Sequence, residues 1–289
     1  MNPLRHYPRP ALDQPLCLLA GRGMYPFTAL RAARAAGVPR IHVVGMIDEA
    51  EPALAAEADS CDWVHVGQIG KVIDSCRKRQ VSQMMMIGQV KPTRLFGGIR
   101  PDLRAFKILA RLKEKNAHSL FGAICDCFEE GGLSILPAHS FLDSCLATPG
   151  QLGRIALDAS RAADAAYGWQ LARECARLDI GQSLVVKRGS ILAVEGFEGT
   201  DRCILRGGEL GRGGVTVIKV AKDGHDLRFD IPVIGLRTVD SLAAAKARSL
   251  ILQAGMTLFI DRERVLSALD DLGICVYGVD PVKAEFPLG

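Results

Sequence analysis

The sequence predicts an α/β fold, in which an N-terminal Rossmann-like domain with a parallel sheet precedes a C-terminal mixed α+β domain. Two observations predict this arrangement. In the first half, short apolar runs alternate with helix-like segments, as they do in parallel α/β sheets. In the second half, a hairpin pattern replaces the regular alternation. A chain of 289 residues is also long enough for two domains of ordinary size.

The domain boundaries are expected where the composition changes. Residues 1–14 are rich in proline and are expected to form a flexible leader. Pro149-Gly150 is the best candidate for a linker. The N-terminal domain is therefore expected over residues 15–148 and the C-terminal domain over residues 149–289, with a ligand cleft between them.

Four strands and three helical segments are expected in the first half. The strands are the apolar runs at 16–20, 41–47, 63–67 and 84–90. The helical segments are at 27–36, 71–79 and 100–131. Glycines follow the strands, at Gly21 and Gly23, Gly45, Gly67 and Gly88. Because parallel sheets bind ligands at the carboxyl ends of their strands, these glycine loops are a candidate ligand site.

The second half is expected to mix strands and helices. A helix is expected at 155–178, and a hairpin around the turn KRGS within 183–199. The remaining elements are a strand at 213–221, a helix at 238–253, a strand at 256–262, a helix at 263–272 and a strand at 275–279.

The stretch DLRFDI, residues 226–231, alternates strictly between charged and apolar side chains. Period-two alternation predicts a half-buried strand, which Pro232 would end. Aspartate is disfavoured inside strands, yet it occurs here twice. Asp226 and Asp230 would lie about 13 Å apart in a straight strand, so one of them is expected to be the reactive group. A surface strand with a solvated charged face is the alternative.

Composition excludes several classes of protein. A net charge of +4 and 6% aromatic residues argue against a dedicated nucleic-acid binder. The nine cysteines are scattered without zinc-ligand spacing, as in a reducing cytoplasm. No apolar run approaches the roughly 20 residues of a membrane-spanning helix. We therefore expect a cytoplasmic protein that contacts membranes only at their surface.

Several local patterns are compatible with phosphate or metal binding, and each has a plainer explanation. The stretch AGRGMYP resembles a phosphate-binding loop, but Pro26 breaks the dinucleotide fingerprint GxGxxG, and a tight turn explains it equally well. Lys91, Arg94 and Arg100 form either an anion clamp or a solvated loop. The acids Glu195, Glu198 and Asp201 suit either a divalent cation or a turn. His225 is either a general base or incidental.

The order of several blocks resembles one family. These blocks are LLAGRGMYP, VGQIGKV, GQVKPTRLFGGIRPDLRAFK, LDIGQSLVVKRGSILAVEGFEGTD, KVAKDGHDLRFDIPVIG and LFIDRERVL. They are similar to the bacterial UDP-2,3-diacylglucosamine pyrophosphatases of the LpxI type, from about Leu16 to Pro281. The resemblance implies a Mg²⁺-dependent hydrolase of lipid A biosynthesis, which forms lipid X and UMP by water attack on the α-phosphorus. It implies that Asp230 is catalytic, with Asp226 ranked second.

The resemblance also implies the remaining site. The N-terminal domain would bind substrate and the C-terminal domain would be catalytic. The expected substrate-binding residues are Gly21, Arg22, Gly23, Pro26, Gly67, Gln68, Gly88, Val90, Lys91, Gln182, Thr200, Lys219, Lys222 and Arg228. The expected Mg²⁺ ligands are Asp230, Asp201 and Glu195. The expected partners are the UDP-diacylglucosamine lipid, the inner-membrane surface in transient contact and a second copy in a homodimer, with no nucleic acid.

Two departures from the family pattern affect the expected contacts. The family's Arg-Pro is Lys91-Pro92 here, and its Pro-x-Gln before the motif is Asp223-Gly224-His225.

A non-catalytic nucleotide-sugar or lipid-precursor binding protein on the same fold remains an alternative, because fold does not fix function. A nicotinamide oxidoreductase is disfavoured by the broken glycine fingerprint. The sequence does not locate the groove that the acyl chains need.

Overall fold

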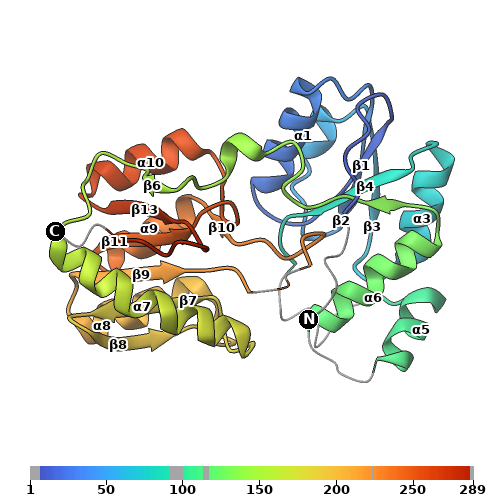
Figure 1. Cartoon of the computed structure of the whole chain (residues 1–289). Helices are drawn as coiled ribbons and strands as arrows, with labels where there is room; N and C mark the ends of the chain where they lie inside the picture. The colour runs from blue at the N-terminus through green and yellow to red at the C-terminus, as the bar shows by residue number, and fades with distance from the viewer. Residues whose placement is uncertain (1–6, 91–99, 113–116, 223, 225, 287–289) are drawn as a thin grey trace. The chain divides into compact units, whose positions relative to one another are not determined.

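The computed structural model describes residues 7–90, 100–112, 117–222, 224 and 226–286. Contacts divide the chain into two compact units, which are described separately (Figure 1). Unit 1 contains Met1–Asp143 and the short segment Asp226–Asp230, and unit 2 contains the rest. The segment that carries the two candidate catalytic aspartates thus packs with the first half of the chain. The domain boundaries and the cleft expected from the sequence remain predictions.

Unit 1 is built on a parallel sheet of five strands in the order β3-β2-β1-β4-β5. The strands are β1 Leu16–Ala20, β2 Ile41–Met46, β3 Ser60–Val64, β4 Gln83–Ile87 and β5 Ser134–Ile135. The parallel sheet of the first half is confirmed. The third strand lies earlier than the expected 63–67, because the side chain of Gln68 accepts the N–H of His65 and closes a turn there.

Five helices of unit 1 are described. They are α1 Tyr25–Ala35, α2 Leu54–Glu57, α3 Ile69–Lys78, α5 Leu103–Arg111 and α6 Ala117–Glu130. The single helical segment expected at 100–131 is divided into α5 and α6. Asp102 caps α5 by accepting the N–H of Ala105. Gly132, at φ 90°, lies just beyond the end of α6, as the sequence predicted.

Unit 2 contains a mixed sheet of six strands in the order β6-β13-β11-β9-β7-β8. The strands are β6 Gly150–Gln151, β7 Ser183–Lys187, β8 Ser190–Val194, β9 Val215–Lys219, β11 Ala247–Gln253 and β13 Cys275–Val279. A second, two-stranded sheet pairs β10 Val233–Ile234 with β12 Leu258–Phe259. The hairpin, β9 and the last strand are confirmed.

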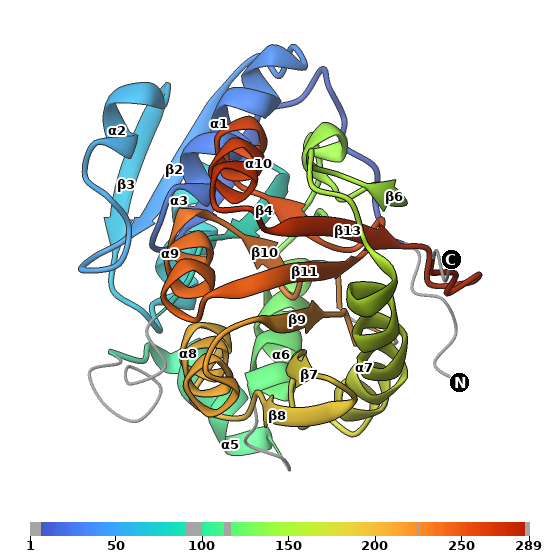
Figure 2. The same ribbon diagram turned by 90° about the vertical axis from the view of Figure 1, so that its left-hand side faces the viewer.

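Helices cover both faces of this sheet (Figure 2). Figure 2 shows α7 on one face and α8, α9 and α10 on the other. The bounds are α7 Ala159–Arg177, α8 Thr200–Gly211, α9 Leu236–Ala244 and α10 Arg262–Asp271, with a short 3₁₀ helix at Asp143–Cys145. Consecutive strand residues alternate between the two cores: Val217 packs with α8 and α9, and Ile218 packs with α7.

One expectation for unit 2 is wrong. The helix expected at 238–253 ends at Ala244, and residues 247–253 form the buried strand β11. Lys246, at φ 47°, breaks the helix, and β11 is buried between β9 and β13, which an apolar run of this length does not reveal.

Of the three acids near Thr200, Asp201 lies in the first turn of α8, whereas Glu195 and Glu198 precede the helix and Glu198 lies in a turn.

Candidate active site

Residues 226–230 form a tight turn rather than the strand that their alternating pattern predicted. The backbone N–H groups of Phe229 and Asp230 both donate to the carbonyl oxygen of Asp226, at 3.1 and 3.0 Å. The chain therefore folds back within four residues, and its side chains do not alternate between two faces. Asp226 and Arg228 are buried, which excludes the alternative of a solvated charged face for these two residues. The strand prediction is wrong because a buried ion pair organises this segment.

The guanidinium of Arg228 is the centre of that ion pair. Only 1% of Arg228 is exposed. Its Nε and Nη2 donate to the two carboxylate oxygens of Asp226, at 2.9 and 2.6 Å. Its Nη1 donates to Asp126 at 3.1 Å and to Glu129 at 2.9 Å, both on α6. Arg228 therefore joins the turn to α6 through three carboxylates.

The surroundings of Arg228 keep it charged. Burial lowers the pKa of a guanidinium, but the hydrogen bonds and negative charge of Asp226, together with the hydrogen bond to Glu129, raise the pKa of Arg228 well above its usual value. The cation is thus maintained at every accessible pH. Its expected role in balancing substrate phosphate charge remains a prediction, because the donors described are directed at carboxylates of the protein itself.

Further contacts hold the turn on either side of Arg228. The carbonyl oxygen of Leu227 accepts the N–H of Ala138 at 2.7 Å. The ring of Phe229 lies 5.6 Å from the ring of Phe121 on α6. Asp230 follows directly and is half-buried. Three consecutive anchored residues therefore fix the point at which Asp230 leaves the turn.

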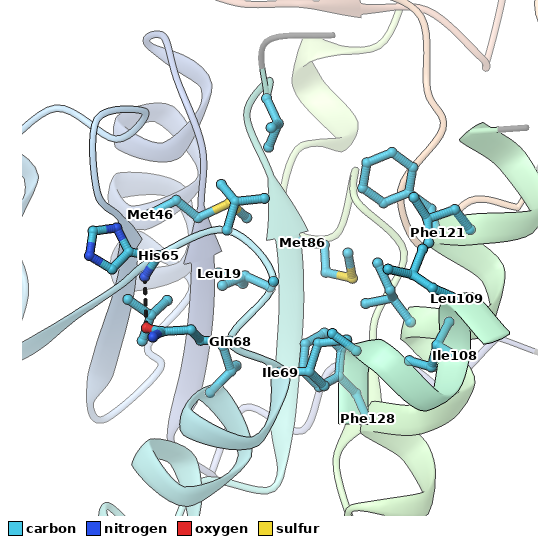
Figure 3. A pocket seen from close by; sticks show the side chains of 18 residues that line it. Leu19, Met46, His65, Gln68, Ile69, Met86, Ile108, Leu109, Phe121 and Phe128 are labelled. Carbon is cyan, nitrogen blue, oxygen red and sulfur yellow. Dashed lines mark hydrogen bonds between the residues drawn. The ribbon is translucent and has the colours of Figure 1, made fainter. Parts of the chain in front are cut away.

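An apolar pocket lies in the same unit (Figure 3). Its cavity volume is about 100 Å³, which is below the ~300–1,000 Å³ typical of small-molecule sites. Leu19 and Met86 line it from the sheet, Leu109 from α5, and Phe121 and Phe128 from α6. Because Phe121 also contacts Phe229, the pocket and the turn that carries Asp230 share a wall.

Three of the expected substrate-binding residues line this pocket: Gly67 and Gln68 in the loop between β3 and α3, and Val90 after β4. His65, in the same loop as Gly67, lines it too, and the surface of the pocket is almost entirely apolar. The N–H of His65 donates to Oε1 of Gln68 at 3.0 Å, the dashed line in Figure 3. The Nε2 of His65 lies 3.2 Å from Nη1 of the exposed Arg100. The apolar pocket therefore has hydrogen-bonding groups and a cation beside it.

The glycine loops after β1 and β4 pack against each other. A Cβ added to Gly21 would lie 2.5 Å from the carbonyl oxygen of Gln89. One added to Gly88, at φ 88°, would lie 2.8 Å from the carbonyl carbon of Gly21. Both glycines are therefore required for the close approach of the two loops. This packing explains Gly21 and Gly88 without a ligand.

The other expected residues of the first loop have varied surroundings. Gly23, at φ 94°, has open space where a Cβ would lie. Arg22 donates to the buried Glu49 at 3.1 Å. Pro26 is buried in the first turn of α1, where a proline is well tolerated.

Unit 2 brings three of the expected residues together. Nζ of Lys219 donates to Oγ1 of Thr200 at 2.8 Å, and Oγ1 of Thr200 donates to Oε1 of Glu195 at 2.9 Å. Lys219 is only 7% exposed. The other carboxylate oxygen of Glu195 is buried and has no hydrogen-bond partner among the described residues. Lys219, Thr200 and Glu195 thus form one hydrogen-bonded row.

The remaining expected residues of unit 2 lie apart from that row. Lys222 forms an ion pair with Asp179 at 2.9 Å, and Asp201 forms one with Arg237 at 3.1 Å. The carbonyl oxygen of Gln182 accepts the N–H of Val220. Within the described ranges, no three histidine, cysteine, aspartate or glutamate side chains gather as metal ligands.

Lys91, Arg94 and His225 lie outside the described residues. The expected anion clamp and the expected general base therefore stay predictions.

Sequence reasoning missed the residues that anchor the turn. Asp126 and Glu129 are three apart on α6 and so lie on one face of the helix. That spacing was a usable signal, but nothing in the sequence pairs these acids with an arginine about 100 residues later. Neither Phe121 nor Phe229 was singled out from the sequence.

Among the helices of the described residues, none combines the length and the apolar character that crossing a bilayer requires.

Comparison with known proteins identifies the family. Residues 15–145 match the model of the LpxI N-terminal domain, and residues 148–277 match that of the LpxI C-terminal domain. A curated relative, the UDP-2,3-diacylglucosamine pyrophosphatase LpxI of Caulobacter vibrioides, is 34% identical over 279 residues, which are 92% of this chain and 98% of that protein. A solved biotin carboxylase domain of Hydrogenobacter thermophilus 2-oxoglutarate carboxylase covers 82% of this chain and 41% of its own at 11% identity and a TM-score of 0.29, too weak a likeness for any argument. The two family models and the curated relative together show that this chain belongs to the LpxI family.

Proposed function

We propose that this chain hydrolyses the pyrophosphate bond of UDP-2,3-diacylglucosamine, giving UMP and 2,3-diacylglucosamine 1-phosphate. The name of the curated relative and its nearly complete coverage support this activity. The observation in this chain that supports it best is the shared wall of the apolar pocket and the Asp226–Asp230 turn, formed by Phe121 and Phe229. A lipid substrate needs such a combination of an apolar site and a carboxylate close to it.

Asp230 is the carboxylate that we assign to the chemistry. Asp226, the other candidate, has both oxygens hydrogen-bonded to the buried Arg228. Asp230 is half-buried and follows a segment anchored at Leu227, Arg228 and Phe229. Its role in the proposal is to orient the water that attacks the α-phosphorus, so that the bond from this phosphorus to the bridging oxygen breaks and UMP leaves with the new oxygen. Fixing that carboxylate in advance lowers the entropy cost of reaching the transition state.

The family implies Mg²⁺, which would neutralise charge on the phosphate oxygens. Mg²⁺ in phosphate-binding enzymes is commonly held by one or two carboxylates, waters and the substrate itself. The chain fits this mode rather than a cage of protein ligands, because no three acidic or histidine ligands gather among the described residues. Two of the expected ligands are each suited to it, taken separately: Asp230 of unit 1, and Glu195 of unit 2 with its unpartnered buried oxygen. Asp201 is the least suited, since Arg237 already pairs with it.

Lys219 is the cation that we assign to the pyrophosphate. Its ammonium is nearly buried, so an ionic interaction with phosphate is less screened than at the surface. The ammonium of Lys219 is oriented by its hydrogen bond to Thr200, which in turn donates to Glu195. Lys222 is a weaker candidate because it pairs with Asp179.

The apolar pocket of unit 1 is assigned to an acyl chain. Each methylene group moved from water into such a site contributes about 0.8 kcal/mol. Gly67 and Gln68, in the loop after β3, line the pocket and are assigned to the contact with the part of the ligand that adjoins the chain. Ligand binding at the carboxyl ends of a parallel sheet is the general rule for Rossmann-like and related folds, which supports that assignment for unit 1.

Three expectations from the resemblance are retained as parts of the proposal. They are transient contact with the cytoplasmic face of the inner membrane, a homodimer and a cytoplasmic location. A substrate with two acyl chains supports the first, since such a molecule partitions into bilayers.

The test is turnover of UDP-2,3-diacylglucosamine dispersed in Triton X-100, with UMP followed by chromatography. The predicted result is release of UMP and diacylglucosamine 1-phosphate in equal amounts with Mg²⁺, loss with excess EDTA, and little turnover of UDP-N-acetylglucosamine, which lacks the acyl chains. Tight binding of the lipid without UMP release would instead show a lipid-precursor binding protein and refute the hydrolase.

A further inference from the structure

Helix α5 has two different faces. Its inner face packs against α3 and α6 (Figure 1). Ala105, Ile108 and Leu109 on this face line the apolar pocket. The helix begins at the cap residue Asp102, whose carboxylate accepts the backbone N–H groups of Ala105 and Gly70. The inner face is therefore fixed by packing and capping.

The outer face of α5 carries large apolar side chains in water. Leu103 is 71% exposed and Phe106 is 63% exposed. They are three residues apart and so lie next to each other on the helix surface. A single exposed leucine is unremarkable in a soluble domain, but an adjacent leucine and phenylalanine form a patch that is costly to leave in water.

Three cations flank this patch. Arg104, Lys107 and Arg111 recur at intervals of three and four, which places them in one row along the helix, and all three are exposed. The nearest acid, Asp102, is already hydrogen-bonded to two backbone groups. Exposed apolar side chains beside a row of cations are the pattern of a helix that lies in a membrane interface.

We propose that the outer face of α5, made by Leu103, Arg104, Phe106, Lys107 and Arg111, docks on an anionic lipid bilayer. The proposal rests on the proposed function, which gives the protein a substrate that partitions into membranes. The basic row selects an anionic surface, and the apolar pair enters the boundary between headgroups and acyl chains. Because the inner face of the same helix lines the pocket, docking here brings the pocket within one helix diameter of the bilayer, about 10 Å.

Flotation with lipid vesicles tests the docking directly. The wild-type chain is expected to float with vesicles of equal parts phosphatidylglycerol and phosphatidylethanolamine, and not with phosphatidylcholine alone. The double variant Leu103→Ser with Phe106→Ser is expected to bind about tenfold more weakly, a factor that corresponds to about 1.4 kcal/mol. The double variant Lys107→Glu with Arg111→Glu is expected to lose binding and its salt dependence.

The matched control is the double variant Leu178→Ser with Val282→Ser, which removes two exposed apolar side chains of unit 2, 58% and 89% exposed. It is expected to bind anionic vesicles like the wild type. Thermal melting confirms that each variant is folded. Equal flotation of the α5 variants and the wild type, or equal binding to neutral and anionic vesicles, would overturn the proposal.

Turnover in two substrate presentations separates this proposal from the proposed function. The α5 variants are expected to hydrolyse substrate in Triton X-100 micelles at the wild-type rate, and substrate in vesicles about tenfold more slowly. Binding to anionic vesicles without turnover in either presentation would support the docking and refute the proposed hydrolase activity. Turnover in micelles without binding to anionic vesicles would support the hydrolase activity and refute the docking.

Discussion

Arg228 and Asp226, two residues apart in the chain, form a buried two-point ion pair: Nε lies 2.9 Å from Oδ1 and Nη2 lies 2.6 Å from Oδ2. The pair converts a segment with a strand-like pattern into a turn. The same guanidinium reaches Asp126 and Glu129 on α6. The position of Asp230 therefore depends on a cluster of charges that need not touch the substrate.

Replacing Arg228 is expected to destabilise unit 1 and to lower activity together. Arg228→Met removes the cation that neutralises the buried Asp226, and breaking a buried ion pair typically costs about 3–5 kcal/mol. Arg228→Lys keeps the charge but not the two-point geometry, so it is expected to fold and to lower kcat more than KM. Urea unfolding and steady-state kinetics measure the two effects.

The control for the Arg228 variants is Arg177→Ala. Arg177 pairs with Glu174 across an exposed turn of α7, with 58% and 59% of the side chains exposed. Exposed pairs contribute about 0–1 kcal/mol, so little change is expected. If Arg228→Lys kept the wild-type kcat, the positioning of Asp230 through Arg228 would be disproved.

Filling the apolar pocket is expected to change acyl-chain selection. Leu109→Trp adds bulk to the wall of the pocket, whereas Ala110→Trp adds it to the exposed side of the same helix. In detergent micelles, Leu109→Trp is expected to raise KM about tenfold for long acyl chains and little for short ones, and Ala110→Trp is expected to leave both unchanged. Equal KM changes for long and short chains would contradict the assignment of the pocket to an acyl chain.

Removing the buried ammonium of Lys219 is expected to lower kcat strongly. Lys219→Met is nearly isosteric and removes the charge that faces Thr200. Loss of a fixed electrostatic group at a transition state typically lowers kcat by about 10²–10³-fold. Lys222→Met removes a lysine that is already paired with Asp179, so a much smaller loss is expected. Similar kcat values for Lys219→Met and the wild type would exclude Lys219 from the site.

Acid is expected to destabilise unit 1 through His42. Burial lowers the pKa of His42, whose Nε2 lies 2.7 Å from Oγ of Ser75. As the pH falls, the histidine of the unfolded chain therefore takes up a proton before that of the folded chain. The contribution of His42 to the free energy of unfolding is complete above the unfolded pKa of about 6.5, and it declines as the pH falls below that value. The melting temperature of the wild type should decrease between about pH 7 and 5. His42→Gln should show a flatter profile, and parallel profiles would contradict this origin of the pH dependence.

Much of the architecture could be predicted from the sequence because its signals are local. The alternation of apolar runs, such as those that begin at Leu16 and Ile41, with helix-like segments predicted the parallel sheet, and KRGS predicted the hairpin. Strand β11 was mistaken for helix because a short, fully buried apolar run has no distinguishing period.

The site could be predicted only in part because its main contacts are distant in sequence. Alternation over 226–231 predicted a strand, since the pattern does not reveal that Arg228 meets Asp126 from about 100 residues earlier. Glu195, Thr200 and Lys219 were all named from the sequence, but their hydrogen-bonded row depends on the pairing of β7 with β9. The apolar pocket had no signal of its own, because its lining residues look like ordinary core.

The measurement that tests the central claim most directly is phosphorus NMR of UDP-2,3-diacylglucosamine hydrolysis in water enriched in oxygen-18, with the wild type, Asp230→Ala and a metal-free control. The predicted result is oxygen-18 in UMP from the wild type with Mg²⁺, and no labelled UMP from Asp230→Ala or without metal. Label in diacylglucosamine 1-phosphate would place the attack on the other phosphorus. Undiminished turnover by Asp230→Ala would contradict the assignment of Asp230 to the chemistry.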